Sequence, residues 1–499
     1  MAKKKSLMQI EKLTGGLPLE SQKKIEDFFV GLDGTLDLPL YSKMLLIEHF
    51  VTGFEYYLDK NYEIDDIIKI LNFENLGGFY KRDTRQYYAL DNAALVYPMG
   101  MKYGQMPLFR LSMELKEEIV PCLLQLALDF TIKRFPVFSA VIKNGFFWHY
   151  LETTNNIHLV EEEKDIPCKP ISLTVRTQRS LRVFYYKKRI SVEFFHVLTD
   201  GNGGLIFLKT LVAEYLKLKG LSVTKEKGVF DIDETPDKRE FVNEFALAKG
   251  ESDFSTFVDK KSLQLDGKNT NLNINRIIHY VIDTEELRKV SKKYNTTITG
   301  YFTAIEFLAA KKCISKDNGI FNIQIPVNMR KFNNSITLRN YSMYFNASMD
   351  LKDINDKQAL IDNVTKQIKK YGGFENMNHM MLTTVKAIKI ISHIPLFIKV
   401  PITQLVYGYL ANSIIGSTLS NLGNVELPEE MKSEVEKMYF LLCPGIPNRV
   451  SSTLVSINNK TVFSLIKNSD NFTFEEEVLN LLKEDGLKIE LGGSSIYES

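Results

Sequence analysis

The stretch from Arg189 to Gly204 constrains the fold most, because it predicts a buried strand, a tight turn and a helix in direct succession. Alternation along its first half places four side chains on one face of a strand: Ile190, Val192, Phe194 and His196. A cluster of turn residues, Asp200-Gly201-Asn202-Gly203-Gly204, ends that strand. Residues 205–216 then carry apolar positions at helical spacing. We therefore expect a histidine where a buried strand ends and a glycine turn begins.

The size and charge of the chain limit its architecture and its partners. At 499 residues it is too long for one ordinary core, and about two to four domains are expected. Its formal net charge is only +2, so bulk charge gives no reason to expect a nucleic-acid partner. The longest uncharged run lies between Lys399 and Glu426 and contains several polar residues. We interpret that run as a buried helix plus a strand, and we expect no transmembrane segment.

The four cysteines (Cys122, Cys168, Cys313 and Cys443) are scattered and show no C-x-x-C spacing. This usage argues against a zinc ribbon or a disulfide framework and agrees with a reducing compartment. The N-terminal Met-Ala-Lys-Lys-Lys leads into polar sequence, without the apolar segment of a signal peptide. We therefore expect a cytoplasmic protein.

Periodicity divides the chain into three parts. Residues 1–85 carry helical apolar spacing, which predicts a helical extension packed on the main body or, alternatively, a partner or lid element. Residues 86–270 and 271–499 each mix strands with helices, which predicts two α/β subdomains. A polar run at 221–271 is interpreted as the linker between them. In the second part, residues 357–411 are expected to form one long helical stretch.

Few motifs in the chain indicate a catalytic, metal-binding or phosphate-binding site. The seven histidines show no H-E-x-x-H or similar metal-binding spacing, so no metal site is expected. Neither a G-x-x-x-x-G-K-[ST] phosphate loop nor a G-x-S-x-G nucleophile elbow occurs, so covalent serine catalysis has no support. What remains is the pattern His196-x-x-x-Asp200-Gly201 at the end of the predicted strand.

The chemistry of this pattern fits a general base. An imidazole that is neutral near pH 7 can take a proton from an alcohol or amine as that group attacks a carbonyl carbon. A strand end would fix the ring of His196, and Gly201 would let the backbone turn sharply. Two arrangements are open for Asp200: it contacts His196 directly, or it turns away and pairs with an arginine that holds the loop.

The chain resembles the chloramphenicol acetyltransferase-like acyltransferases, whose signature is H-x-x-x-D-G. That superfamily includes alcohol acetyltransferases and the condensation domains of nonribosomal peptide synthetases. Besides His196-Val-Leu-Thr-Asp200-Gly201, the resemblance rests on stretches in the order of the superfamily: 90–98 (LDNAALVYP), Arg134-Phe-Pro136 with Gly145-Phe-Phe-Trp148, Pro326-Val-Asn-Met-Arg330, and Ser420-Asn-Leu-Gly423 with Leu427-Pro428. The D-F-G-W-G box of the plant-type members is absent, and residues 1–85 have no counterpart in the pattern.

The resemblance implies an α/β fold of two similar subdomains in a V, with a central tunnel that admits donor and acceptor from opposite faces. It implies that His196 is the base and that Asp200 is structural, in an ion pair with Arg330. It also implies that Ser420 and Asn421 line the far wall near the reacting centre. Acetyl-CoA or another acyl thioester would be a co-substrate, and no bound cofactor would be needed.

These expectations combine into one predicted function and two alternatives. The prediction is a CoA-thioester-dependent acyltransferase that acts on a small-molecule alcohol or amine without an acyl-enzyme, most simply as an O-acetyltransferase on an alcohol. One alternative is a stand-alone condensation-type enzyme that takes acyl groups from a carrier protein. The other is a non-catalytic binding protein that retains the fold. The sequence names neither the acceptor nor the acyl chain length.

Overall fold

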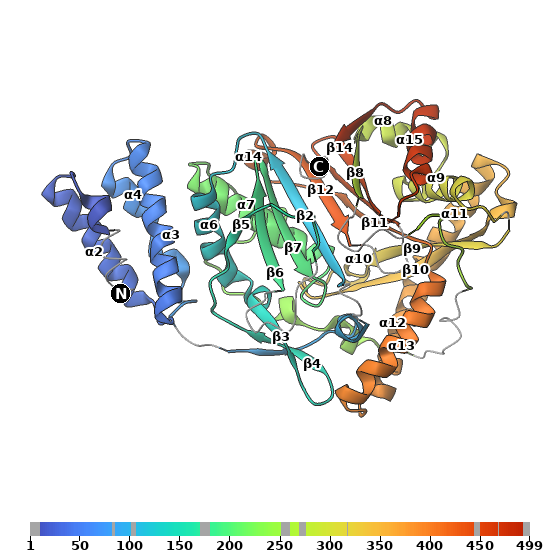
Figure 1. Cartoon of the computed structure of the whole chain (residues 1–499), viewed down its shortest axis with the longest axis horizontal. Helices are drawn as coiled ribbons and strands as arrows, with labels where there is room; N and C mark the ends of the chain where they lie inside the picture. The colour runs from blue at the N-terminus through green and yellow to red at the C-terminus, as the bar shows by residue number, and fades with distance from the viewer. Residues whose placement is uncertain are drawn as a thin grey trace.

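A computed structural model gives the fold of the chain (Figure 1). It describes residues 10–81, 85–100, 106–169, 180–250, 260–268, 276–316, 318–443, 450–467 and 469–492, without the side chains of 100 and 406–413.

The N-terminal part is helical, as its periodicity predicts, and it packs against the side of the main body. It consists of α2 (Leu19–Thr35), α3 (Leu40–Asp59), α4 (Ile64–Ile70) and the short 3-10 helix η1 (Phe73–Leu76). Helix α3 lies against α6 (Pro121–Thr131), where His49 Nδ1 is 2.7 Å from Asp129 Oδ2. Gly53 permits this approach, since a Cβ there would lie 2.6 Å from a Leu126 methyl group. In Figure 1 these helices occupy the end of the molecule away from the second sheet.

The first large sheet is five-stranded, in the order β12-β2-β7-β6-β5. Its strands are β2 (Leu108–Leu115), β5 (Val160–Glu162), β6 (Leu181–Tyr186), β7 (Arg189–Phe195) and β12 (Val435–Leu442). β6 and β7 form an antiparallel hairpin, and β7 is buried along its whole length. Helices α6 and α7 (Gly201–Leu218) pack together beside this sheet (Figure 1). The predicted sequence of strand, turn and helix at 189–218 is therefore present.

The second large sheet is seven-stranded, in the order β10-β9-β11-β13-β14-β8-β15. Its strands are β8 (Arg276–Asp283), β9 (Ile320–Asn328), β10 (Ser342–Asp350), β11 (Ser417–Asn424), β13 (Val450–Ile457), β14 (Lys460–Lys467) and β15 (Ile489–Gly492). The helices of this half are α8 (Thr284–Lys293), α9 (Ile298–Cys313), α10 (Arg330–Asn333), α11 (Lys357–Tyr371) and α15 (Thr473–Glu484), whereas α14 (Glu429–Lys432) packs on β12 of the first sheet. Helix α9 packs against both α11 and α15.

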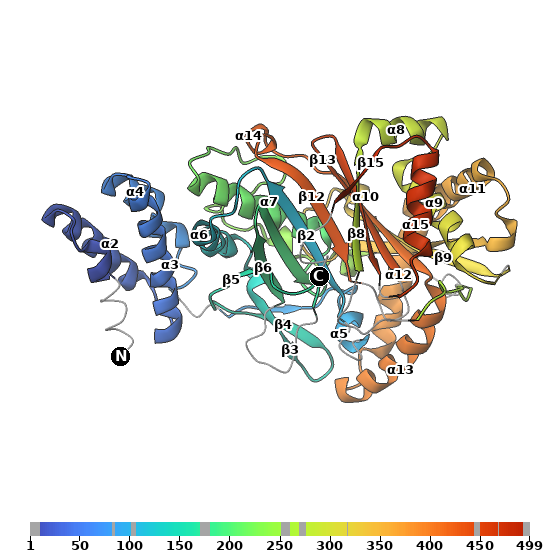
Figure 2. The same cartoon turned by 45° about the horizontal axis from the view of Figure 1, so that its top comes forward.

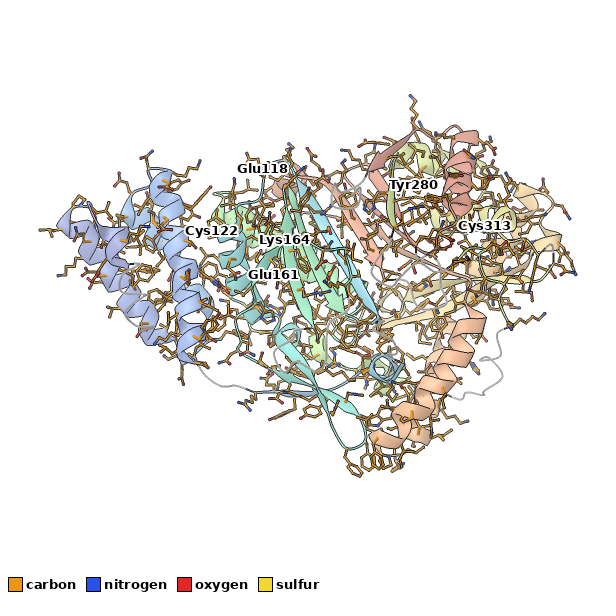
Figure 3. The ribbon with its side chains drawn as sticks, in the orientation of Figure 1. Glu118, Cys122, Glu161, Lys164, Tyr280 and Cys313 are labelled. Carbon is orange, nitrogen blue, oxygen red and sulfur yellow. The ribbon has the colours of Figure 1, made fainter. Side chains whose placement is uncertain are left out.

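Two large apolar clusters correspond to the two halves. One joins the N-terminal helices to the first sheet, and the other surrounds the second sheet. Cys122 and Cys313 lie in different halves (Figure 3), and all four cysteines are free thiols. This is the α/β fold with two subdomains and a helical extension that the sequence predicts.

A third, three-stranded sheet, β1-β4-β3, lies below the first one in Figure 1. It is built from β1 (Tyr87–Ala89), β3 (Ala140–Asn144) and β4 (His149–Thr153). Near it lie α5 (Val96–Gly100), α12 (Phe374–Ile391) and α13 (Leu396–Ile414), and α13 packs on α5. The single helical stretch expected at 357–411 is in fact three helices, because Gly372-Gly373 and Pro395 interrupt it.

Two structural features connect the two halves of the molecule: the pairing of β12 and the contacts of Glu240. Strand β12 belongs to the second half of the sequence but pairs with β2 in the first sheet. The run interpreted as a linker is instead ordered where the structure describes it. There Glu240 binds Arg134 through two hydrogen bonds of 2.7 Å, and its carbonyl accepts from Leu338 N at 2.7 Å. Polar composition predicted a linker here. In the described part of the run, Glu240 contacts Arg134 in the first half and Leu338 in the second half.

Among the described residues, no helix is both long and apolar enough to cross a membrane.

Candidate active site

The turn after β7 is shaped by Asp200, which begins helix α7. Asp200 has extended backbone angles, and its Oδ1 accepts hydrogen bonds from Asn202 N at 3.2 Å and Gly203 N at 3.3 Å. This is the N-cap arrangement that satisfies the first free N–H groups of a helix. Gly203 is required for close packing here, since a Cβ would lie 2.2 Å from Thr199 Oγ1 and 2.4 Å from Leu338 O. The D-G-x-G sequence thus starts helix α7, after a short turn that follows the end of β7 at Phe195.

The second carboxylate oxygen of Asp200 reaches the other half of the molecule. Oδ2 accepts from Arg330 Nη1 at 2.8 Å and from Tyr341 N at 2.8 Å. The described structure thus contains the Asp200–Arg330 ion pair that the resemblance implied, and of the two arrangements left open Asp200 adopts the one that turns toward an arginine.

The Arg330 side chain is fully occupied by protein acceptors. Its Nε donates to Thr337 O at 2.9 Å and its Nη2 donates to Arg339 O at 2.6 Å, in addition to the bond to Asp200. Both Arg330 and Asp200 are buried. The guanidinium therefore clamps the loop at 337–341 onto the start of α7.

His196 lies immediately after β7 and is half-buried. Its backbone N–H donates to Pro107 O at 2.9 Å, which extends the pairing of β7 by one residue. The imidazole packs against the rings of Tyr97 and Phe109, with centroids 5.0 and 5.1 Å away. The ring is thus fixed from the backbone side and from two aromatic faces.

Asn340 determines which nitrogen of His196 carries the proton. Its Nδ2 donates to Asp91 Oδ2 at 3.1 Å and to the His196 carbonyl at 2.9 Å, and both of these partners are acceptors. The amide oxygen must therefore face His196 Nδ1, which lies 2.8 Å away. An amide oxygen only accepts, so Nδ1 must be the donor. In the neutral ring, Nε2 is then the nitrogen with the free lone pair.

Asp91 supports Asn340 from a fully buried position. Its Oδ1 accepts from Ala94 N at 2.8 Å, and Arg339 Nη2 lies 3.6 Å from its Oδ2. Burial raises the pKa of Asp91, and the charge of Arg339 and the bonds from Asn340 oppose that rise. Asp91 belongs to a stretch that carried the resemblance, but no role was predicted for it. Asn340 was missed altogether, because its partners are 144 and 249 residues away and nothing in its neighbourhood marks it.

Ser420 and Asn421, which the resemblance placed on the far wall, lie on β11 of the second sheet. Ser420 is nearly buried. The Asn421 amide is held locally, donating to Thr299 Oγ1 at 3.0 Å and accepting from Gly423 N at 2.7 Å. Their neighbour Leu422 touches the start of α7, since a Cβ on Gly201 would lie 2.8 Å from a Leu422 methyl group. The structure therefore joins His196, Asp200, Gly201 and Arg330 closely, and brings the β11 pair beside them without a direct bond to His196.

In the part of the chain that the structure describes, no group of three or more His, Cys, Asp or Glu side chains could hold a metal ion.

Comparison with known proteins gives the fold a context. No protein-family model matches the chain, and no curated protein sequence matches it significantly. Among solved structures, TRI3 trichothecene 15-O-acetyltransferase from Fusarium sporotrichioides superposes with a TM-score of 0.55 at 12% identity, over 80% of this chain and 94% of that one. TRI101 from F. sporotrichioides, solved with coenzyme A and T-2, gives 0.55 at 10% identity, over 81% and 99%.

A starter condensation domain of rhizomide synthetase RzmA, in a variant solved with C8-CoA, gives a TM-score of 0.53 at 10% identity, over 80% of this chain and 94% of that one. At such identities the likeness concerns the fold alone. The chain therefore has the two-subdomain α/β fold of the chloramphenicol acetyltransferase-like acyltransferases and condensation domains.

Proposed function

We propose that this protein transfers an acyl group from a CoA thioester to the hydroxyl group of a small molecule, with His196 as general base and without an acyl-enzyme. The observation that carries the proposal is the hydrogen bond of 2.8 Å between His196 Nδ1 and Asn340 Oδ1. It supports a ring whose Nε2 is unprotonated and available to accept a proton. The fold supports the donor class, since TRI101 was solved with coenzyme A and the RzmA domain with C8-CoA.

The reaction follows from that tautomer. Nε2 takes the proton of the acceptor hydroxyl as its oxygen attacks the thioester carbonyl carbon. The tetrahedral intermediate collapses by breaking the carbon–sulfur bond, and the departing thiolate receives the proton from Nε2 of the imidazolium. Nδ1 keeps its proton and its hydrogen bond to Asn340 Oδ1 throughout, so the ring does not rotate between the two transfers.

Other residues have supporting roles in this proposal. Asp200 and Arg330 hold the loop and α7 in place, and they are positioning residues because neither is free to meet substrate. The hydroxyl of Ser420 is our candidate for stabilising negative charge on the thioester oxygen, on the strength of its place beside Leu422 and Gly201. The acetyl group is the simplest donor. The free thiols support a cytoplasmic location.

Release of free thiol from acetyl-CoA in the presence of a panel of alcohols and amines tests this function. We expect release that depends on an acceptor and that His196→Ala abolishes. Intact mass measured after incubation with acetyl-CoA alone should stay unchanged, because no acyl-enzyme forms. Equal thiol release by wild type and His196→Ala would contradict the assignment of the base.

A carrier protein is the second candidate donor, because the same fold occurs in condensation domains at a similar TM-score. Competition separates the two donors: acyl-carrier protein and acyl-CoA are supplied together at equal concentration, with the acyl group isotopically labelled on one of them. Product labelled only from the carrier would favour this candidate, and indifference to the carrier would exclude it.

A further inference from the structure

Large apolar side chains are exposed together along one edge of the molecule. The edge combines the tip of the β3–β4 hairpin with helix α13, which lie at the bottom of the molecule in both Figure 1 and Figure 2. The two segments touch, since Leu396 N donates to Phe146 O at 2.8 Å. Phe397, Leu405 and Phe146 are 72%, 70% and 67% exposed. We call this set the apolar edge: Phe146, Phe147, Phe397, Ile398, Ile402 and Leu405.

The exposed apolar side chains of α13 recur at helical spacing. Ile398, Ile402 and Leu405 recur at i, i+4 and i+7, which places them in one stripe of α13. The side chains that fix α13 to the body are on another side: Leu396 is buried, and Lys399 Nζ lies 3.1 Å from the centre of the Trp148 ring. A stripe of this kind on a globular protein normally faces an apolar partner.

The charges around the apolar edge indicate what that partner is. Residues 376–425 contain no aspartate or glutamate at all, whereas Lys386 and Lys389 are exposed on α12. A stretch of sequence in which exposed phenylalanine, isoleucine and leucine occur with lysines and without carboxylates has the composition of a segment that lies in a lipid headgroup region. Anionic lipids attract such lysines, and they repel carboxylates.

The helix is built to lie on a bilayer rather than to cross it. Pro401 interrupts the backbone hydrogen bonding of α13, and Thr403 and Gln404 follow it. We propose that the apolar edge docks the protein on an anionic membrane surface, with its phenylalanine, isoleucine and leucine side chains in the headgroup and upper acyl region and Lys386 and Lys389 among the lipid phosphates.

A cavity lies at this edge, between the tip of the β3–β4 hairpin and the start of α13. It has a volume of about 400 Å³ and is lined by Pro98, His149, Leu396 and Phe397, among others. Pro98 follows Tyr97 on α5, whose ring packs on the His196 imidazole at 5.0 Å. Burial, with a smaller contribution from the charge of Lys399, lowers the pKa of His149 to about 4, so this wall of the cavity is neutral at physiological pH.

Sedimentation of the full chain with lipid vesicles tests the docking without reference to activity. The probes are vesicles of phosphatidylcholine alone and of phosphatidylcholine mixed with phosphatidylglycerol. We expect the wild type to partition onto the mixed vesicles, and Ile402→Glu/Leu405→Glu to bind them at least about tenfold more weakly. Lys386→Glu/Lys389→Glu should remove the preference for the anionic lipid.

The matched control is Leu19→Glu/Val30→Glu on α2, where the side chains are 83% and 73% exposed but the lysines of the helix are accompanied by Glu20, Glu26 and Asp27. It should bind vesicles like the wild type, and melting temperatures establish that all variants are folded. Wild type that stays in the supernatant with both vesicles, or equal binding by wild type and Ile402→Glu/Leu405→Glu, would overturn the proposal. So would a dimer that dissociates in that variant while no vesicle binding is seen, since a second copy would then cover the edge. Because the readout is binding, its failure leaves the acyltransferase proposal standing, and loss of acyl transfer leaves this result intact.

Discussion

Arg330 Nη1 donates to Asp200 Oδ2 at 2.8 Å, across 130 residues of sequence and from one half of the molecule to the other. The same carboxylate caps α7 through its other oxygen. One side chain thus starts the helix that follows His196 and ties that helix to the second sheet. The Asp200–Arg330 contact between the subdomains therefore fixes the segment that follows His196, although His196 itself is not part of that ion pair.

Replacing Asp200 by asparagine separates these two roles. The amide oxygen can still cap α7, but the buried guanidinium of Arg330 loses its counter-charge, which costs about 3–5 kcal/mol. Urea unfolding measures the loss. Asp283→Asn is the control, since Asp283 caps α8 through a bond of 2.9 Å from Glu286 N at an exposed site. That change should cost less than about 1 kcal/mol. Similar losses in both variants would mean that the ion pair contributes little.

We expect Asn340 to affect catalysis by orienting the His196 ring, and not by binding the substrate. Asn340→Ala removes the acceptor of His196 Nδ1–H, so kcat is expected to fall about 10- to 100-fold with little change in KM. Asn340→Asp should move the acid limb of the kcat/KM profile to higher pH, because a carboxylate beside the ring favours its protonated form. An unchanged kcat in the first variant together with an unchanged profile in the second would remove Asn340 from the mechanism.

Glu306 on α9 makes stability depend on pH. It is fully buried between Ser417 and Ser452, which hydrogen-bond to it, and burial raises its pKa from 4.5 to about 7. Because the folded pKa exceeds the unfolded one, the folded state binds more protons between these values, and stability falls as pH rises from about 4.5 to 7.

Glu306→Gln removes this titration while keeping both serine contacts. The difference of about 2.5 units corresponds to about 3 kcal/mol, so the variant should gain about that much relative to wild type between pH 4.5 and 7.5. Chemical unfolding at several pH values measures the difference, and every other titrating group cancels in it. A constant offset between the two proteins would show that Glu306 is already ionised in the fold.

Gly203 tests the geometry of the turn. Alanine there would press a methyl group against Thr199 Oγ1 and Leu338 O, so we expect a loss of about 1–3 kcal/mol in the free energy of unfolding. Gly34 near the end of α2 is the matched control, because a Cβ there meets no atom within 4 Å. Gly34→Ala should be neutral or stabilising by up to about 1 kcal/mol. Equal effects would indicate that the turn accommodates a side chain.

Local patterns in the sequence predicted most of the secondary structure around the site. The alternation of 190–196 and the turn residues 200–204 specify β7 and the start of α7 without help from the rest of the chain. The helices of the N-terminal part follow from their periodicity in the same way. The ion pair to Arg330 was expected only through the resemblance, since spacing alone left Asp200 either beside His196 or away from it.

What the sequence could not provide depends on distant contacts. Asn340 orients His196 only because Asp91 and the His196 carbonyl hold its amide, and no local signal reports those partners. Strand β12 joins the sheet of the other half, and nothing in its own residues indicates that pairing. The polar run at 221–271 is interpreted as a linker from its composition, which does not report that Glu240 binds Arg134, 106 residues away.

The rate of acetyl transfer by His196→Gln tests the central claim most directly. Glutamine is similar in size to histidine and its amide can donate to Asn340, but it cannot take a proton from the acceptor. With an acceptor identified by the thiol-release panel, kcat/KM of this variant should fall about 10²- to 10⁴-fold while its melting temperature and its binding of CoA match the wild type. A folded His196→Gln enzyme with the wild-type rate would show that His196 is not the base.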